Sequence, residues 1–233
     1  MKTIFYIFLF SAAIVASSFI NKDQHTNKIY KELDKYLQTC AKDFNKITPE
    51  RKTQLKKVTL FLKTKLSAEK KASLVFICTH NSRRSHMSQI WAQTAAEYYG
   101  VKGVSCYSGG TEASAFNPRA VKALTKGGFK ITKTSEDKNP IYEVKFSDNG
   151  TVVKAFSKKY GDEPNPKSNF CAVMTCSQAD KTCPTVEGAS FRVAIPYEDP
   201  KAFDGTAEEE AKYDERCRQI ATEMMYIFSL YSK

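Results

Sequence analysis

One stretch of sequence organises this chain: Leu74-Val75-Phe76-Ile77-Cys78-Thr79-His80-Asn81-Ser82-Arg83-Arg84-Ser85. An apolar, β-branched run ends at a cysteine, an arginine follows six positions later, and a helical pattern begins after Ser85. This order predicts a buried strand, a short loop and a helix, with backbone N–H groups of the loop gathered around one anion at the positive end of the helix dipole. The same field would favour the thiolate form of Cys78, and Arg84 would bind two oxyanion oxygens.

The other residues of this loop are expected to support it. Asn81 is interpreted as a brace that keeps the loop N–H groups pointing inward, and the Ser85 hydroxyl as a donor to the Cys78 sulfur. Arg83 is expected to be a solvated charge on the rim. His80 is assigned to the rim as well, with contact to the substrate as the alternative. The candidate oxyanion-binding and loop-supporting residues are Thr79, His80, Asn81, Ser82, Arg83 and Ser85.

Strand and helix patterns alternate from residue 73 to the end of the chain. Strands are predicted at residues 74–78, 104–108, 170–175 and 191–195, and helices at 85–99, 117–126 and 206–230. Such alternation argues for an α/β fold with a parallel four-stranded sheet flanked by helices. Ligands of these sheets bind beyond the carboxyl ends of the strands. The side chains expected to gather there are Cys78, Ser108, Cys176 and Asp199.

Residues 139–166 interrupt this alternation. Two apolar-polar runs, 142–146 and 152–156, flank Asp148-Asn149-Gly150, which is a strong hairpin turn signal. We therefore expect an inserted β-hairpin, which either covers the site or only extends an edge of the fold.

The N-terminal third is expected to be an addition to the catalytic domain of residues 73–233. Residues 1–20 carry one lysine, an apolar run and a small-residue exit, which predict a secretory signal peptide or, alternatively, an uncleaved membrane anchor. Residues 21–72 hold 14 Lys/Arg against 6 Asp/Glu and show the periodicity of a basic helical hairpin that leans on the main domain. The expected location is therefore exported, periplasmic or membrane-anchored, and otherwise cytoplasmic, with possible membrane association through the N-terminus.

Composition narrows the chemistry further. Basic residues are not interleaved with aromatic residues on a recognisable module, so a nucleic-acid partner is not expected. Seven cysteines are an odd number in a chain too long to need a disulfide framework. No CxxC occurs and the three histidines lack ligand-like spacing, so neither a metal nor another cofactor is expected. The cysteines expected to be packing residues are Cys40, Cys106, Cys171 and Cys217.

Four motifs in order carry a family resemblance. The segment 78–85 resembles the phosphate loop of the low-molecular-weight protein tyrosine phosphatase superfamily. Ser108-Gly109-Gly110-Thr111 with Asn117-Pro118 is similar to its second strand end and following helix, and Tyr197-Glu198-Asp199-Pro200 to its general-acid loop. Residues 174–184, with Cys176 and Cys183, resemble the redox segment of the thioredoxin-coupled arsenate reductases, a branch of that superfamily.

The resemblance implies a three-thiol reduction of arsenate. Cys78 would attack arsenate held by the loop and Arg84, while Asp199 protonates the departing oxygen. Cys176 would then attack the Cys78 sulfur, and Cys183 would move the disulfide outward to a thioredoxin-like reductant. Seven helical residues separate the last two thiols by about 10 Å, whereas the Cα atoms of a disulfide lie within about 7 Å. The segment must therefore unwind locally.

Two departures and two alternatives accompany this prediction. His80 stands where the family usually has glycine, so a crowded or strained loop is expected there. Gln89 stands where arsenate reductases tend to carry a glutamate associated with a potassium site, so no metal is carried over.

The first alternative is a protein tyrosine phosphatase that hydrolyses phosphotyrosine or aryl phosphates with Cys78, Arg84 and Asp199 alone. The second is a non-catalytic oxyanion-binding or redox-sensing domain.

Overall fold

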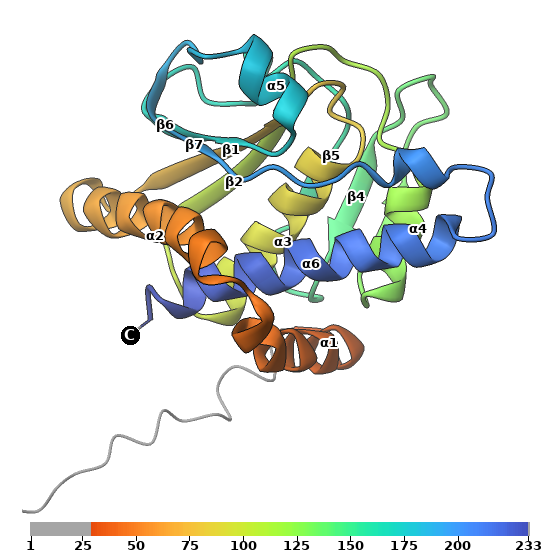
Figure 1. Ribbon diagram of the computed structural model, residues 1–233, viewed down its shortest axis with the longest axis horizontal. Coiled ribbons are helices and arrows are strands. Elements are labelled where there is room, and N and C mark those ends of the chain that lie inside the picture. The colour runs from red at the N-terminus through yellow and green to blue at the C-terminus, as the bar shows by residue number, and fades with distance from the viewer. Residues whose placement is uncertain (1–28, 233) are drawn as a thin grey trace, which may run out of the picture.

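The protein is built around a four-stranded parallel sheet, as the sequence predicts. The computed structural model describes residues 29–232 (Figure 1). The strand order is β2-β1-β6-β7. These strands are Val104–Gly110, Ala72–Cys78, Phe170–Met174 and Ala189–Ala194. All three strand pairs are parallel, and the register places Cys78 beside Gly110 and Ile77 beside Met174.

Helices cover both faces of this sheet. The α-helices are α1 (Lys31–Lys42), α2 (Pro49–Glu69), α3 (Arg84–Tyr98), α4 (Pro118–Lys126), α5 (Ser177–Thr182) and α6 (Glu209–Ser229). Figure 1 shows α5 above the sheet and α2, α3 and α6 below it. Side chains of β1 alternate accordingly: Leu74 and Phe76 enter the large core below, and Val75 and Ile77 the small cluster above. The carboxyl end of β1 thus lies between two packed layers.

The predicted hairpin is confirmed, but it belongs to a larger sheet. Strands β4 (Tyr142–Lys145) and β5 (Val153–Ala155) pair antiparallel, and β3 (Lys130–Lys133), which the sequence pattern did not reveal, pairs antiparallel with the outer edge of β4. The chain that returns from β5 passes the end of β2, where the Gly110 N–H donates to the Lys158 carbonyl at 2.9 Å. The insert is therefore more than an edge decoration.

The two predicted N-terminal helices are present, and they share the main core instead of only leaning on it. Leu33 and Leu37 of α1 and Leu55 and Leu62 of α2 are completely buried in the same cluster as the β1 side chains. Both helices pack on α6, and α2 also contacts β1 and β7. A 3-10 helix, η2 (Asp43–Lys46), connects them. Residue 72 is thus the start of a strand, not a boundary between two cores.

The start of α2 and the membrane predictions have separate outcomes. The Thr48 hydroxyl accepts from the Arg51 N–H at 3.2 Å, and Pro49 is the first helical residue, as predicted. The predicted signal peptide or anchor of residues 1–20 lies outside the described residues. Among residues 29–232, no helix is both long enough and apolar enough to span a bilayer.

Candidate active site

The loop after β1 places Cys78, the candidate nucleophile, at the N-terminus of α3. The Cys78 Sγ lies 3.1 Å from the Ser85 Oγ, and the Asn81 side-chain N–H donates to the same oxygen at 2.8 Å. Because the Ser85 oxygen already accepts one hydrogen bond, its own proton is free to be donated to the sulfur. The sulfur thus lies beside the Ser85 hydroxyl at the first turn of α3. Cys78 itself is only 3% exposed.

Asn81 holds the loop in shape from within. It is completely buried, and its backbone has φ +42°, in the left-handed region that asparagine tolerates better than most residues. Its side-chain oxygen accepts from the Lys158 N–H at 2.9 Å, so the insert and the loop are tied together. The predicted bracing role therefore has a structural basis that includes a residue from outside the loop.

His80 lies on the rim, as predicted, and the strain expected of it is not there. Its side chain is half exposed, with Nδ1 3.2 Å from a Glu112 carboxylate oxygen. Among the described residues, the loop position with positive φ is Asn81 and not His80. The His80 carbonyl accepts from the Ser114 and Ser157 hydroxyls at 3.1 and 3.0 Å. A side chain is thus accommodated because it points away from the loop interior.

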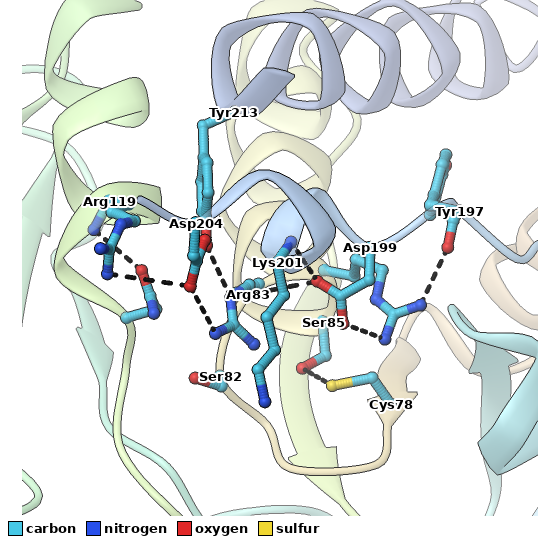
Figure 2. Close-up of polar contacts among 12 residues, drawn as sticks. Cys78, Ser82, Arg83, Ser85, Arg119, Tyr197, Asp199, Lys201, Asp204 and Tyr213 are labelled. Atoms are coloured by element: carbon cyan, nitrogen blue, oxygen red, sulfur yellow. Dashed lines mark hydrogen bonds and ion pairs between the residues drawn. The ribbon is translucent and has the colours of Figure 1, made fainter. Parts of the chain in front are cut away.

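Arg84 and the candidate acid Asp199 are in direct contact beside the loop. The Arg84 Nη2 donates to the Asp199 Oδ2 at 2.7 Å, and the Arg84 Nη1 to the Tyr197 carbonyl at 2.9 Å. Asp199 also caps the 3-10 helix η3 (Pro200–Phe203), because its Oδ1 accepts from the Lys201 N–H at 3.1 Å. Figure 2 shows Asp199 on the same side of the loop as Cys78 and Ser85. An arriving oxyanion would compete with Asp199 for the Arg84 fork.

Arg83 is mostly shielded from solvent, and the prediction of a solvated rim charge is wrong. Its side chain is 11% exposed; its Nε donates to the Tyr213 hydroxyl at 2.8 Å and its Nη2 lies 3.7 Å from Asp204 (Figure 2). The Tyr213 hydroxyl in turn donates to the Asp204 Oδ1 at 2.8 Å. The cause is long-range: α6 and the segment before it close over the loop, which the local sequence does not reveal. Arg83 therefore ties the loop to the C-terminal segment.

Thr79 is the first residue of the loop and Ser82 lies near its other end. The Ser82 hydroxyl donates to the Ala115 carbonyl at 2.7 Å. The Thr79 carbonyl accepts from the Glu112 N–H at 2.8 Å, while its hydroxyl lies 3.5 Å from the Cys176 Sγ. Thr79 thus makes a direct contact between the loop and the predicted redox segment.

The predicted redox segment, residues 174–184, contains a short helix with one thiol at each end. Cys176 is the N-cap of α5, where its sulfur accepts from the Ala179 N–H at 3.3 Å, and Cys183 is the first residue beyond the helix. Cys176 is 1% exposed and Cys183 is partly exposed. Cys78 and Cys176 belong to one apolar cluster, and Cys183 packs against it. All seven cysteines are free thiols in this structure.

The four remaining cysteines are packing residues, as predicted. Each is buried, and none belongs to the cluster that contains Cys78. Burial raises the pKa of Cys40 to about 11 and that of Cys217 to about 12. It raises the pKa values of Cys106 and Cys171 further still. These thiols stay protonated at neutral pH and are poor nucleophiles.

Lys158 and His86 are polar residues near the loop whose positions the sequence did not indicate. Burial lowers the pKa of Lys158 to about 8. His86 follows Ser85 and is completely buried, and burial followed by the nearby Lys158 ammonium lowers its pKa well below the usual value. His86 is therefore neutral, and its Nδ1 lies 3.1 Å from the Ser108 hydroxyl. Because Lys158 is reached only through the fold of the insert, no local signal distinguishes it from its neighbour Lys159.

Metal ligands do not gather at this site. Within residues 29–232, no group of three or more His, Cys, Asp or Glu side chains is arranged to hold an ion. Gln89, which stands where the resemblance implies a glutamate, donates its side-chain amide to the Cys106 carbonyl at 3.1 Å.

Comparisons with known proteins identify sequence relatives that share this region of the chain. The model of the family described as low molecular weight phosphotyrosine protein phosphatase matches residues 73–154. An arsenate reductase of Bacillus cereus (strain 03BB102) is 30% identical over 132 residues, which cover 57% of this chain and 79% of that protein. An arsenate reductase of Bacillus licheniformis is 28% identical over 160 residues, or 68% and 96% of the two chains. The crystal structure of a YwlE mutant from Bacillus subtilis aligns with a TM-score of 0.48 and 17% identity, covering 70% of this chain and all of that one.

Proposed function

This chain belongs to the low molecular weight phosphotyrosine protein phosphatase family, and we propose that within this family it reduces arsenate to arsenite. Membership makes the chain an enzyme, either a reductase or a phosphatase. One observation carries the choice of reduction: the Cys78 and Cys176 thiols share one buried apolar cluster, and the Cys183 thiol packs against it. Hydrolysis has no use for the second and third thiols.

In the proposed reaction the first step uses the loop alone. The Cys78 thiolate attacks arsenic, and one hydroxyl group of the arsenate leaves as water after taking a proton from Asp199. The loop N–H groups and Arg84 stabilise the remaining oxyanion oxygens. Arg84 must turn from Asp199 toward the substrate, which also frees the acid from its present 2.7 Å contact. The product of this step is a thiol-bound arsenic(V) species.

The second and third steps pass electrons through the redox segment. The Cys176 thiolate attacks the Cys78 sulfur, the sulfur–arsenic bond breaks, and its electron pair reduces arsenic(V) to arsenic(III), which leaves as arsenite. The Cys183 thiolate then attacks the Cys176 sulfur and releases Cys78 as a thiolate. A thioredoxin-like dithiol is the proposed partner that reduces the final disulfide. The partial exposure of Cys183 supports this order, because the outermost thiol pair must meet the partner.

Disulfide mapping after treatment with arsenate tests this proposal. Reduced protein is incubated with arsenate, quenched with an alkylating reagent and mapped by mass spectrometry. We expect a Cys176–Cys183 bridge that requires both arsenate and Cys78, and that also forms in the control variant Cys106→Ala, whose thiol lies outside the cluster. Turnover of arsenate by Cys176→Ala and Cys183→Ala at the rate of the unmodified chain would show the relay to be wrong.

Hydrolysis of phosphate esters is the second candidate. It is favoured by the loop itself, because Cys78, Arg84 and Asp199 are together without any help from the redox segment. This alternative predicts release of phosphate from phosphotyrosine or an aryl phosphate without a reductant. The activity would survive Cys176→Ala and Cys183→Ala and would be lost in Cys78→Ser.

We propose separately that the enzyme is exported or anchored in a membrane. The apolar run near the N-terminus supports export or anchoring, so the reductant would be an exported thioredoxin-like protein. Fractionation of cells that produce the full chain would test this. Recovery of all of the protein in the cytoplasmic fraction, with its N-terminal residues intact, would contradict it.

A further inference from the structure

Arg192 on β7 holds the C-terminal end of the redox helix α5. Its Nη2 donates to the Asp180 carbonyl at 2.9 Å, to the Asp180 carboxylate at 2.6 Å and to the Cys183 carbonyl at 3.0 Å. Neighbouring residues Phe191 and Val193 face the large core on the other side of the sheet, so Arg192 points to the α5 side. One guanidinium nitrogen thus lies within hydrogen-bond distance of two oxygens of Asp180 in α5 and of the carbonyl of Cys183, the first residue beyond the helix.

These contacts satisfy groups that the helix cannot satisfy by itself. The last carbonyls of a helix have no intrahelical N–H partner, and a cation there interacts favourably with the helix dipole. In α5, the Cys176 and Ala179 carbonyls accept from the Asp180 and Cys183 N–H groups, whereas the Asp180 and Cys183 carbonyls accept from Arg192. Arg192 therefore stabilises the helical form of this segment.

The helical form is the one in which the two thiols are apart. Cys176 and Cys183 lie at opposite ends of α5, about 10 Å along the helix axis at 1.5 Å per residue. A disulfide brings its two Cα atoms to within about 7 Å. The segment must shorten for the bridge to form, and the residues that move include Asp180 and Cys183, to which Arg192 is bound.

We propose that Arg192 is a positioning residue that stabilises the dithiol form of α5 and thereby raises the reduction potential of the Cys176–Cys183 couple. The proposal rests on the relay described under Proposed function. Contacts that exist in one of two states shift the equilibrium toward that state by their free energy. A couple whose dithiol form is stabilised passes its oxidising equivalents more readily to a dithiol partner.

Redox titration of the couple tests this role. In the full chain carrying Cys78→Ser, the protein is equilibrated with mixtures of dithiothreitol and its cyclic disulfide. The two thiols lose two protons and two electrons, which the cyclic disulfide takes up to form dithiothreitol. The fraction bridged between Cys176 and Cys183 is measured by alkylation and mass spectrometry.

Arg192→Met is expected to shift the equilibrium constant toward the disulfide about tenfold, which corresponds to a reduction potential lower by about 30 mV. Arg192→Lys is expected to give a smaller shift, because an ammonium reaches fewer of the three oxygens. The matched control is Lys181→Met, which removes an exposed cation from α5 itself and is expected to change the constant less than twofold. Asp180→Asn, which leaves β7 untouched, is expected to shift it in the same direction as Arg192→Met and gives the test if that variant does not fold.

The outcomes separate this inference from the relay itself. A bridge that forms with the same equilibrium constant in the Arg192→Met chain and in its parent leaves the relay standing and overturns the role of Arg192. A shift in Lys181→Met as large as that in Arg192→Met also overturns it, because the effect would then be one of charge alone. A parent chain that forms no Cys176–Cys183 bridge at any ratio overturns the relay, and the inference with it.

Discussion

The ion pair between Arg51 of α2 and Glu223 of α6 gives a quantitative test of how the N-terminal helices stabilise the fold. Arg51 donates to both carboxylate oxygens at 2.8–3.0 Å, and the two side chains are 19% and 4% exposed. The Arg51 guanidinium also lies 4.8 Å from the centre of the Tyr197 ring, and the Tyr197 carbonyl accepts from Arg84. Helix α2 is thus connected to the candidate catalytic arginine through Tyr197.

The substitution Arg51→Met would leave the Glu223 carboxylate buried with one fewer partner. Removing one member of a buried ion pair costs about 3–5 kcal/mol, whereas replacing both members with apolar side chains is often close to neutral. Gln219 still donates to Glu223 at 3.1 Å. We therefore expect Arg51→Met to lower the free energy of unfolding by about 3 kcal/mol, at the low end of that range, and Arg51→Met/Glu223→Met to recover most of the loss.

Urea unfolding at pH 7, followed by circular dichroism and extrapolated linearly to water, measures these free energies. The control Lys56→Met removes an exposed cation from the same helix and is expected to change stability by less than about 0.5 kcal/mol. The reasoning would be refuted if Arg51→Met cost less than about 1 kcal/mol, or if the double variant were no more stable than the single one.

Two further predictions concern Gly110 and Lys158, whose backbones form hydrogen bonds next to the loop. A Cβ at Gly110 would lie 2.1 Å from the Glu112 carbonyl oxygen and 2.6 Å from that of Thr79. Gly110→Ala should therefore displace the loop and lower kcat/KM for arsenate at least about tenfold. Gly161→Ala is the control: a Cβ there meets nothing within 4 Å, so kcat/KM should not change. Because burial lowers the pKa of Lys158 from 10.5 to about 8, the folded state disfavours the charged ammonium, and Lys158→Met should be more stable than the unmodified chain by about 3 kcal/mol at pH 7. This advantage should shrink as the pH rises from 8 to 10.5, where the unfolded chain also loses the proton, and a stability gap that is the same at pH 7 and pH 10 would contradict it.

The strands and the loop were predictable because their signals are local. A strand buried on both faces needs a continuous apolar run, as in residues 74–78 and 170–174. A cysteine that follows such a run and precedes a helix start leaves few alternatives to an anion-binding loop. The cap of α2 by Thr48 is local in the same sense, since a hydroxyl and the N–H three residues later suffice.

Features that depend on contacts distant in sequence were not predictable. Strand β3 has only Ile131 as an apolar residue, so no alternation marks it, and it forms because β4 offers an edge. The shielding of Arg83 from solvent depends on Tyr213, which is 130 residues away. The positive charge of residues 21–72 predicted a separate segment. That charge comes mainly from the solvent-facing sides of α1 and α2. It does not describe the leucines that join the common core.

The proposed mechanism leaves the choice between reduction and hydrolysis to the central atom of the bound oxyanion. In hydrolysis water would attack phosphorus, whereas in reduction Cys176, which shares one buried apolar cluster with Cys78, would attack the Cys78 sulfur. Attack on sulfur succeeds only if the departing atom accepts an electron pair, as arsenic(V) does and phosphorus(V) does not under these conditions. A phosphate ester bound in the same loop would therefore leave the dithiol intact and be hydrolysed by water. We therefore expect a Cys176–Cys183 disulfide to form when arsenate is the substrate. When a phosphate ester is the substrate, both thiols should stay reduced during turnover.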